Sequence, residues 1–370
     1  ALLLSEGNII AIKNTSGYLL CCNAENPEVI QKLRDKKHRP NKPFAVLYPS
    51  LEMLQKEVIL NDKQLNSLTS AERPINIVSL ENYKGKIALE KVAPNLNQLG
   101  VMLPYTGILQ LLANELSFPI VATSGNIHGS PIISENGEAI KRLRDIADYF
   151  LQHNLKIEHP QDDSVVKFST KFQQEVLFRR SRGYAPNYLE TSINSEEKIL
   201  AMGAHLKSTI AFFPNSNLYI SQYLGNLDNF DVYKRFTEVT ENFIQLFEQQ
   251  PKIILVDKHP MYQSTQFGKE LAKKKNSKVI EIQHHKAHFS AILGEHNLFD
   301  KKVLGVVFDG TGFGDGNGVG GNGSGNTPGD GEGTKNLDRK VTDSGGITAK
   351  ADEEGKMALD IWVDEKGAVV

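Results

Sequence analysis

Residues 36–46 have the sequence KKHRPNKPFAV, and residues 121–132 have the sequence VATSGNIHGSPI. The first stretch carries cations from the end of a predicted helix into a predicted buried strand. Such cations can bind a polyphosphate because Arg and Lys match phosphate oxygens, although the helix dipole alone also favours them there. The second stretch places Thr123-Ser124-Gly125-Asn126 directly after a strand, where it can bind a nucleotide or acyl group or simply form a hydrogen-bonded turn.

Strand and helix signals alternate around these two stretches. Asn26-Pro27-Glu28 predicts a helix start, because it combines a capping residue, a proline at the first helical position and an acid near the positive end of the dipole. Ser134 is predicted to cap another helix, with the apolar stripe Ile140, Leu143, Ile146, Ala147 and Phe150. Apolar runs predict strands over residues 8–13, 18–22, 43–47, 119–123, 164–168 and 176–178. The sequence thus predicts a first α/β domain, a mixed twisted sheet with helices, over residues 1–188.

A second α/β pattern follows a polar linker at residues 189–197. Strands are predicted over 199–202, 209–213, 218–221, 253–257, 279–283 and 303–308, and helices over 232–246, 264–275 and 285–296. Three strands followed by strand–helix alternation are typical of the first lobe of an actin-like or RNase-H-like fold. We therefore expect a partial lobe of this kind at residues 198–315, a Gly-rich linker at 316–336 and a short β-rich tail at 337–370.

Composition excludes several classes of protein. The 370 residues have a formal net charge of −2, so the whole chain has no strong attraction for nucleic acid or an anionic membrane. Cys21 and Cys22 are the only cysteines, and adjacent strand residues point to opposite faces. We interpret both as reduced packing residues of a cytoplasmic protein. No apolar run has the roughly 18 residues that a membrane helix needs.

Histidines and a glycine-rich loop mark the second pattern. His284 and His288 are four residues apart, so a helix would place both imidazoles on one face, with His285 pointing elsewhere. This spacing alone fits a shared metal or ordinary core histidines. Asp309 ends a predicted strand and opens the loop Asp309-Gly310-Thr311-Gly312, where backbone N–H groups can approach phosphates and the carboxylate can bind a cation, or where the aspartate merely forms a turn.

Five motifs of the first domain occur in the order found in a known family. KKHRPNKPFAV, GVMLPYTGILQLL, VATSGNIHGSPI, DDSVV and RRSRGYAP resemble the YrdC-like domain of HypF-type carbamoyltransferases of hydrogenase maturation. The resemblance implies a catalytic role for Lys37 and Arg39 in forming carbamoyl-adenylate from ATP and carbamate derived from carbamoyl phosphate, with Mg²⁺. The implied nucleotide-binding residues of this domain are Lys37, Arg39, Lys42, Ser124 and Asn126, with Arg180 and Arg182 closing the pocket. Asp162 and Asp163 match DDSVV, without an evident role.

The second pattern resembles the Kae1-like domain of the same family. The matching segments are GAHLKSTIAF, SQYLGNLDN, DKHPMYQSTQ, QHHKAH and VVFDGTGFGD. The resemblance implies that His284, His288 and Asp309 bind a divalent Fe or Zn ion beside a nucleotide held by Gly310, Thr311 and Gly312. It also implies transfer of the carbamoyl group to the C-terminal cysteine of a HypE-type partner.

The chain departs from the family pattern at several points. Tyr223 and Asn226 stand where the family has His and Asp, so the resemblance carries no role over to them. The family continues past residue 315 with a second lobe, whereas this chain enters the glycine-rich stretch, and its tail EEGKMALDIWVDEKGAVV faintly resembles the C-terminal domain of TonB-type proteins. We therefore expect a truncated or chimeric chain that forms carbamoyl-adenylate but does not complete transfer to HypE.

Two other functions fit the same residues. Domains of the YrdC-like and Kae1-like types also act in threonylcarbamoyl modification of tRNA, so threonylcarbamoyl-adenylate synthesis is one alternative. A YrdC-like fold, a double-stranded-RNA-binding type of fold, has a concave basic surface, so an RNA-binding module using residues 34–42 is another. The near-neutral charge and the absence of aromatic residues within that basic run favour the enzyme.

Overall fold

The computed structural model describes residues 1–127, 129–191, 193, 195–309, 312–313, 319–320 and 358–360. The chain divides into two compact units. The first unit comprises Ala1–Tyr188, Leu206–Thr209 and Tyr219–Val239, and the second comprises Leu189–His205, Ile210–Leu218 and Thr240–Val370. Two segments that the sequence assigns to the second domain therefore pack with the first unit.

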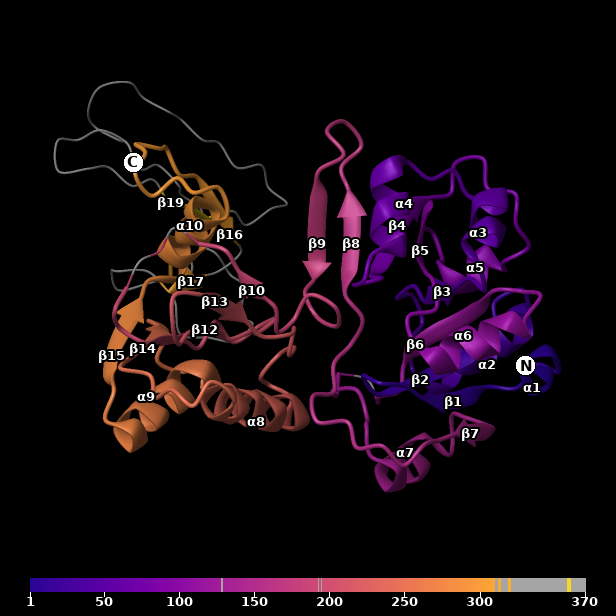
Figure 1. Cartoon of the computed structure of the whole chain (residues 1–370), viewed down its shortest axis with the longest axis horizontal. Coiled ribbons are helices and arrows are strands. Elements are labelled where there is room, and N and C mark those ends of the chain that lie inside the picture. Colours follow the sequence, from indigo (N-terminus) through magenta and orange to yellow (C-terminus); the bar gives the residue numbers. More distant parts are fainter. Residues whose placement is uncertain are drawn as a thin grey trace, which may run out of the picture. The chain divides into compact units, whose positions relative to one another are not determined.

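The first unit is built on a nine-stranded sheet with the order β7-β1-β2-β6-β3-β5-β4-β8-β9 (Figure 1). Its strands are β1 Ile10–Lys13, β2 Tyr18–Asn23, β3 Ala45–Leu47, β4 Ile75–Ser79, β5 Gln98–Met102, β6 Ile120–Ser124, β7 Tyr149–Leu151, β8 Val165–Phe168 and β9 Glu175–Arg179. Strand β3 is parallel to β5 and antiparallel to β6. The predicted mixed α/β class is confirmed.

The pairing of β3 with β6 positions the site. Ala45, at the start of β3, lies opposite Ala122, near the end of β6. Because the two strands are antiparallel, the start of β3 lies beside the end of β6, so the chain enters β3 and leaves β6 at the same end of this strand pair. The basic run before β3 and the Ser124-Gly125-Asn126 turn after β6 are therefore neighbours, although more than 80 residues separate Lys37 from Ser124 along the chain.

Seven helices accompany this sheet in the described part of the first unit before β8. They are α1 Leu2–Ser5, α2 Pro27–Lys36, α3 Leu51–Glu57, α4 Asp62–Thr69, α5 Leu89–Val92, α6 Gly107–Asn114 and α7 Asn136–Leu143. The predicted start of α2 is confirmed, since the Asn26 side chain accepts hydrogen bonds from the backbone N–H groups of Glu28 and Val29.

The prediction for α7 is wrong in two respects. Glu135, rather than Ser134, occupies the N-cap position, and it makes no side-chain capping hydrogen bond. The helix ends at Leu143, and Phe150 lies in the edge strand β7. The apolar spacing continued past the true helix end because the turn after α7 and the strand β7 also supply residues to the core, including Ile146 and Ala147.

The core lies on both faces of the sheet. One cluster contains Tyr18, Leu20 and Cys22, and the other contains Leu19 and Cys21, as strand alternation requires. Both cysteines are fully buried free thiols, and burial raises the pKa of the Cys21 thiol to about 12. They are packing residues, as predicted from their adjacency.

The second unit contains a six-stranded sheet with the order β10-β13-β12-β11-β14-β15. Its strands are β10 Tyr188–Leu189, β11 Ile199–Ala201, β12 Ala211–Phe213, β13 Leu218–Ile220, β14 Ile253–Asp257 and β15 Lys278–Ile282. Strand β14 runs parallel to both β11 and β15. Three quick strands followed by parallel strands joined through helices confirm the predicted pattern.

The helices of this region follow the predicted spacing. They are α8 Phe230–Leu246, α9 Gln263–Lys275 and α10 His284–Glu295. Val232, Phe236, Val239 and Phe243 form the buried face of α8, whereas Leu246, which was predicted on that face, is exposed at the last turn. Gly268 of α9 lies so close to the sheet that an added Cβ would meet Val256 Cγ1 at 2.6 Å.

The last strand of the second unit is shorter than predicted. Strand β16 spans Val307–Asp309, because residues 303–306 make no ladder, and it pairs antiparallel with β19 Ala358–Asp360. The short strands β17 Gly312–Phe313 and β18 Val319–Gly320 pair with one another. Apart from those short strands, the predicted linker and tail lie outside the described residues. Within the described residues, no helix combines the length and apolarity needed to cross a membrane.

Candidate functional site

A cavity of about 670 Å³ lies in the first unit, a volume within the usual range for small-molecule sites. Five residues predicted to bind the nucleotide all line this cavity: Lys37, Arg39, Lys42, Ser124 and Asn126. The structure therefore brings the basic run and the turn after β6 into one hollow. Asp162, Arg179 and Tyr223 also contribute polar side chains to its wall.

Local backbone geometry shapes both motifs. Helix α2 gives way to a left-handed residue at His38, with φ of 50°, which turns the basic run away from the helix axis. Gly125 donates its N–H to Tyr18 O, and a Cβ at this position would lie 2.7 Å from Tyr18 Cβ. Only glycine lets the turn approach β2 this closely.

Lys37 joins the two motifs directly. Its ammonium donates to Ser124 O at 2.8 Å, to Asn126 O at 2.9 Å and to Asn126 Oδ1 at 3.1 Å. Burial, followed by the charge of Arg39, lowers the pKa of Lys37 to about 7, whereas the three oxygen acceptors favour its charged form. The side chain thus holds the turn in place, in addition to contributing charge to the cavity.

Arg39 and Lys42 are the other two cations of the basic run that line the cavity. Arg39 packs over the Phe44 ring at 4.9 Å and donates to Thr123 Oγ1 at 3.3 Å and to the carbonyls of Lys42 and Pro43. Burial, and then neighbouring arginines, lowers the pKa of Arg39 to about 10. Burial also lowers the pKa of Lys42. Buried cations crowded in this way gain stability when an anion enters among them.

The arginines that the sequence predicts to close the cavity do not line it. Arg182 is buried in an ion pair with Asp163 at 2.7 Å, and Arg180 donates to the carbonyls of Tyr184 and Asn187. From this part of the chain, Arg179 lines the cavity instead, and sequence analysis missed it. A register shift in the β8–β9 ladder, where Val165 pairs with Arg179 but Val166 pairs with Leu177, sets its direction.

The two acids of the DDSVV motif have different environments. Asp163 is 8% exposed and bonded to Arg182. Asp162 lines the cavity, and its backbone carbonyl accepts a hydrogen bond from Arg182 N at 3.1 Å. Both acids line the cavity, but Asp163 is paired with Arg182, whereas the carboxylate of Asp162 makes no such contact among the described residues.

Part of the cavity wall comes from the segment Tyr219–Val239, which packs with the first unit. Tyr223 and Asn226, the two positions that depart from the family pattern, both line the cavity. Tyr223 N donates to Arg180 O at 2.7 Å, and burial raises the pKa of its phenol. Arg142 also pairs with Asp231 at 3.1 Å. Sequence analysis gave no sign that this segment would reach the nucleotide-like cavity.

A histidine–aspartate cluster lies in the second unit. The ligand atoms of His284, His288 and Asp309 all lie within 4.8 Å of one another, so the structure brings the three predicted metal ligands together. The Nε2 atoms of the two histidines are 3.2 Å apart, and His284 Nε2 is 3.3 Å from Asp309 Oδ2. Two imidazole nitrogens and a carboxylate are a common donor set for a divalent transition metal. The residues present fit such an ion.

Asp257 orients this cluster and was missed by sequence analysis. It ends β14, and its Oδ2 accepts a hydrogen bond from His284 Nδ1 at 2.6 Å. This contact raises the pKa of His284 and leaves Nε2 directed at His288 and Asp309. A carboxylate behind a ligating histidine is the usual arrangement at metal sites. One sequence signal could have identified Asp257: it is an acid at the end of a predicted buried strand, and the next predicted strand leads directly to the histidines.

His285 also differs from its prediction. It was expected to point away from the cluster, but it is buried, and its Nε2 lies 3.5 Å from Asp309 Oδ2. The turn of α10 and the position of Asp309 allow two successive histidines to approach one carboxylate. Gly310 and Thr311, predicted to hold nucleotide, lie outside the described residues, and Gly312 begins β17.

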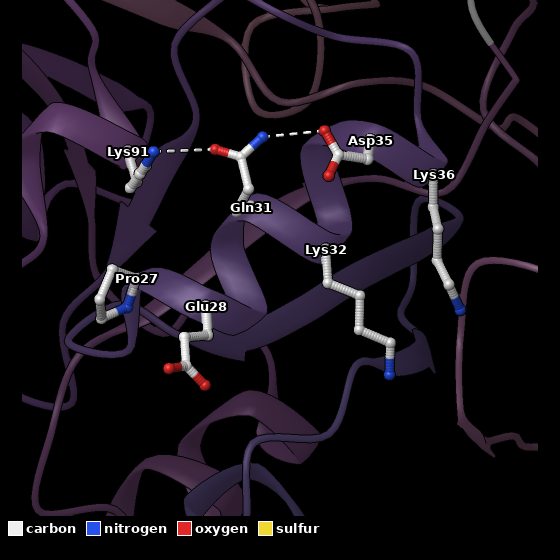
Figure 2. A pocket seen from close by; sticks show the side chains of 7 residues that line it. All are labelled: Pro27, Glu28, Gln31, Lys32, Asp35, Lys36 and Lys91. Atoms are coloured by element: carbon white, nitrogen blue, oxygen red, sulfur yellow. Dashed lines mark hydrogen bonds between the residues drawn. The ribbon is translucent and has the colours of Figure 1, made fainter.

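A second hollow lies on the outer face of α2 (Figure 2). Its wall contains a chain of hydrogen bonds from Lys91 to Gln31 and from Gln31 to Asp35. Glu28, Lys32 and Lys36 add charges of both signs. The hollow is open and its charges are mixed, as expected for a solvated helix face, and it shares no lining residue with the cavity described above.

Comparisons with known proteins follow the division seen in the motifs. Residues 2–181 match the Sua5/YciO/YrdC family model, described as telomere recombination, and residues 194–295 match the HypF Kae1-like domain model. The carbamoyltransferase HypF of Synechocystis sp. is 41% identical over 311 residues, which cover 84% of this chain and 40% of that protein. The crystal structure of full-length HypF in the phosphate- and nucleotide-bound form has a TM-score of 0.79 at 39% identity, covering 86% of this chain and 49% of that one.

More distant similarity extends to threonylcarbamoyl-AMP synthases. The threonylcarbamoyl-AMP synthase of Hydrogenovibrio crunogenus is 26% identical over 163 residues, 42% of this chain and 84% of that protein.

The fold and sites thus define a YrdC-like domain followed by a Kae1-like domain. This pair, in this order and at this identity, is that of the HypF carbamoyltransferases, and the chain belongs to that family. It spans about 40% of the length of the curated relative described above.

Proposed function

We propose that this chain acts in [NiFe] hydrogenase maturation. In this proposal it joins carbamate, derived from carbamoyl phosphate, to ATP, and its Kae1-like part contributes residues to passing the carbamoyl group to the C-terminal cysteine of a HypE-type protein. The observation that carries the proposal is the shared cavity: the basic run and the turn after β6 line one hollow of about 670 Å³. Similarity to a HypF whose structure contains phosphate and nucleotide supports the same assignment.

The first step is an adenylation. A carbamate oxygen attacks the α-phosphorus of ATP, the bond to the bridging oxygen breaks, and pyrophosphate leaves, giving carbamoyl-adenylate. Arg39, Lys42 and Arg179 would neutralise the charge that develops on the phosphates, while Lys37 holds Ser124 and Asn126 in position. Positioning and preorganised charge are the main contributions that a protein makes to such a step.

The second step would use the cluster in the second unit. His284, His288 and Asp309 would hold a divalent Fe or Zn ion, which polarises an oxygen of the bound carbamoyl donor when present. The thiolate of the acceptor cysteine attacks the carbamoyl carbon, and AMP leaves with the electron pair of the broken bond. Asp257 keeps the Nε2 atom of His284 available for this ion.

ATP–pyrophosphate exchange tests the proposal. The full chain should exchange labelled pyrophosphate into ATP when carbamoyl phosphate or carbamate is added. The variant Lys42→Met should lower ATP affinity by about 10-fold to 100-fold, because a charge-assisted phosphate contact is worth roughly 1.5–3 kcal/mol. Lys141→Met, which removes an exposed lysine from α7, is the matched control and should leave affinity unchanged. Absence of ATP binding by calorimetry would refute the proposal.

Threonylcarbamoyl-adenylate synthesis is the second candidate, because a synthase of that type is a distant relative of the first domain. Threonine and bicarbonate would then replace the carbamoyl donor. Exchange that requires threonine and is indifferent to carbamoyl phosphate would favour this alternative over the carbamoyl route.

A further inference from the structure

Asp162 stands out among the acids of the first unit. It lines the cavity, yet in the described part of the chain its carboxylate makes no hydrogen bond or ion pair. Its neighbour Asp163, by contrast, is bonded to Arg182 at 2.7 Å. The backbone of Asp162 is fixed on both sides, because its carbonyl accepts from Arg182 N and the preceding Gln161 N donates to Ser16 O at 3.0 Å. The free carboxylate is therefore held in a defined place.

The surroundings of this carboxylate are cationic. The negative charge of Asp162 acts to raise the pKa values of Lys37, Arg39 and Lys42, against the larger lowering by burial. No cation of the wall is bonded to it, so its charge remains available to a ligand. A triphosphate entering the same cavity would meet four cations, Lys37, Arg39, Lys42 and Arg179, and this one unpaired acid.

We infer that Asp162 is the protein ligand for the Mg²⁺ ion that enters the cavity on the phosphates of ATP. This inference rests on the proposed function, because it needs a nucleotide in the cavity. A bare carboxylate beside a triphosphate repels it, whereas a divalent cation between them makes both contacts favourable. Mg²⁺ is typically bound through one or two carboxylates together with substrate phosphates, its other positions being filled by water.

The same charges predict the order of binding. Without phosphate, a divalent ion at Asp162 would face the surrounding lysines and arginines, and the adjacent acid of the wall, Asp163, is already paired with Arg182. We therefore expect Mg²⁺ to join the cavity only with the nucleotide. In terms of linkage, Mg²⁺ and ATP should strengthen one another's binding, and the carboxylate of Asp162 should carry that coupling.

The experiment is calorimetric titration of the full chain and of Asp162→Asn with a non-hydrolysable ATP analogue, in excess EDTA and in excess Mg²⁺. In the wild-type chain Mg²⁺ should tighten binding on the order of 10-fold or more. In Asp162→Asn the analogue should bind in EDTA at least as tightly as to wild type, because a repulsive charge is gone, and Mg²⁺ should no longer tighten it. The opposite directions of the two effects distinguish a metal ligand from a residue that merely supports the fold.

Asp145→Asn is the matched control, since Asp145 is an exposed acid that does not line the cavity and the charge change is identical. It should keep the tightening by Mg²⁺. Circular dichroism of each variant establishes that it folds, and the EDTA titration reports binding by the variant itself. If Asp162→Asn fails to fold, Asp162→Glu replaces it, and a reduced tightening by Mg²⁺ is then expected because the carboxylate is displaced by one methylene.

Each outcome has a meaning. Tightening by Mg²⁺ that survives in Asp162→Asn would overturn the inference while leaving ATP binding intact. A raised KM for the carbamoyl donor with unchanged Mg²⁺ dependence would instead assign Asp162 to recognition of the carbamoyl amide, and would also overturn it. A wild-type chain that binds no ATP analogue in either buffer would refute the proposed function itself.

Discussion

Replacing Arg182 by methionine tests whether this arginine stabilises the fold rather than binding the nucleotide. The Arg182 side chain is 11% exposed, and its guanidinium donates to Asp163 Oδ1 at 2.7 Å, to Glu72 O at 2.8 Å and to Arg73 O at 2.8 Å. It also stacks over the ring of Tyr105 at 3.4 Å. All of these contacts are within the first unit, and Arg182 itself does not line the cavity.

The expected magnitude follows from the burial of the partner. Asp163 is 8% exposed, so Arg182→Met leaves a buried acid without its cation. Breaking a buried pair at one end costs about 3–5 kcal/mol, a large share of the roughly 5–15 kcal/mol that stabilises a typical domain. The double variant Arg182→Met with Asp163→Asn should recover part of this loss, because the isolated charge is then absent.

The matched control is Arg179→Met, three residues away in the chain. Arg179 lines the cavity and donates one hydrogen bond to Asp163 O at 2.7 Å, so its loss should cost only about 0.5–1.5 kcal/mol. It should, however, weaken ATP binding, which Arg182→Met should not do in the fraction that remains folded.

The assay is urea unfolding of the full chain followed by far-ultraviolet circular dichroism, with the transition of the first unit fitted separately if the two units unfold in steps. Calorimetric ATP titration completes it. An unfolding free energy of Arg182→Met within about 1 kcal/mol of wild type, together with a tenfold loss of ATP affinity, would refute the structural role and restore the role predicted from sequence.

Three further predictions concern the other elements of the two sites. Burial, and then neighbouring charge, lowers the pKa of Lys37 to about 7 in the folded chain, so between pH 7 and the usual lysine pKa the unfolded chain binds more protons than the folded chain. The stability linked to this shift is therefore present at high pH and is lost as pH falls toward 7. Urea midpoints measured across this pH range should show a shallower dependence in Lys37→Met. Asp257→Asn should weaken metal binding by about 10-fold to 100-fold, measured by chelator competition, because His284 loses the acceptor that orients it; unchanged affinity would contradict this. Gly125→Ala should lower stability by about 1–3 kcal/mol and weaken ATP binding, since its Cβ would meet β2 at 2.7 Å, whereas Gly137→Ala, with nothing within 4 Å, should do neither.

Local features were predictable because their physical causes are local. The Asn26 cap, the proline at the first turn of α2 and the opposite directions of Cys21 and Cys22 depend on a few adjacent residues, and the structure confirms each of them. The pairing of His284 with His288 likewise follows from helical spacing once α10 forms. In such cases the chain itself sets the distance between the groups.

Other features required partners that are distant in sequence. Arg179 rather than Arg180 or Arg182 faces the cavity because of a register shift in the β8–β9 ladder, which sequence spacing does not reveal. Asp257 supports His284 because β14 and β15 are adjacent and parallel, which places the ends of both strands at one edge of the sheet.

By itself, then, the sequence determined the fold class, the start of α2 and the chemical character of the two sites, since composition and periodicity act over a few residues. Only tertiary structure decided that Lys37 would hold the turn at Ser124 and that Tyr223 would line the first cavity. It also decided that Asp163 would pair with Arg182 while the carboxylate of Asp162 would face the cavity. The physical reason is that strand order and register fix which side chains meet, and these depend on the packing of the whole sheet rather than on any one segment.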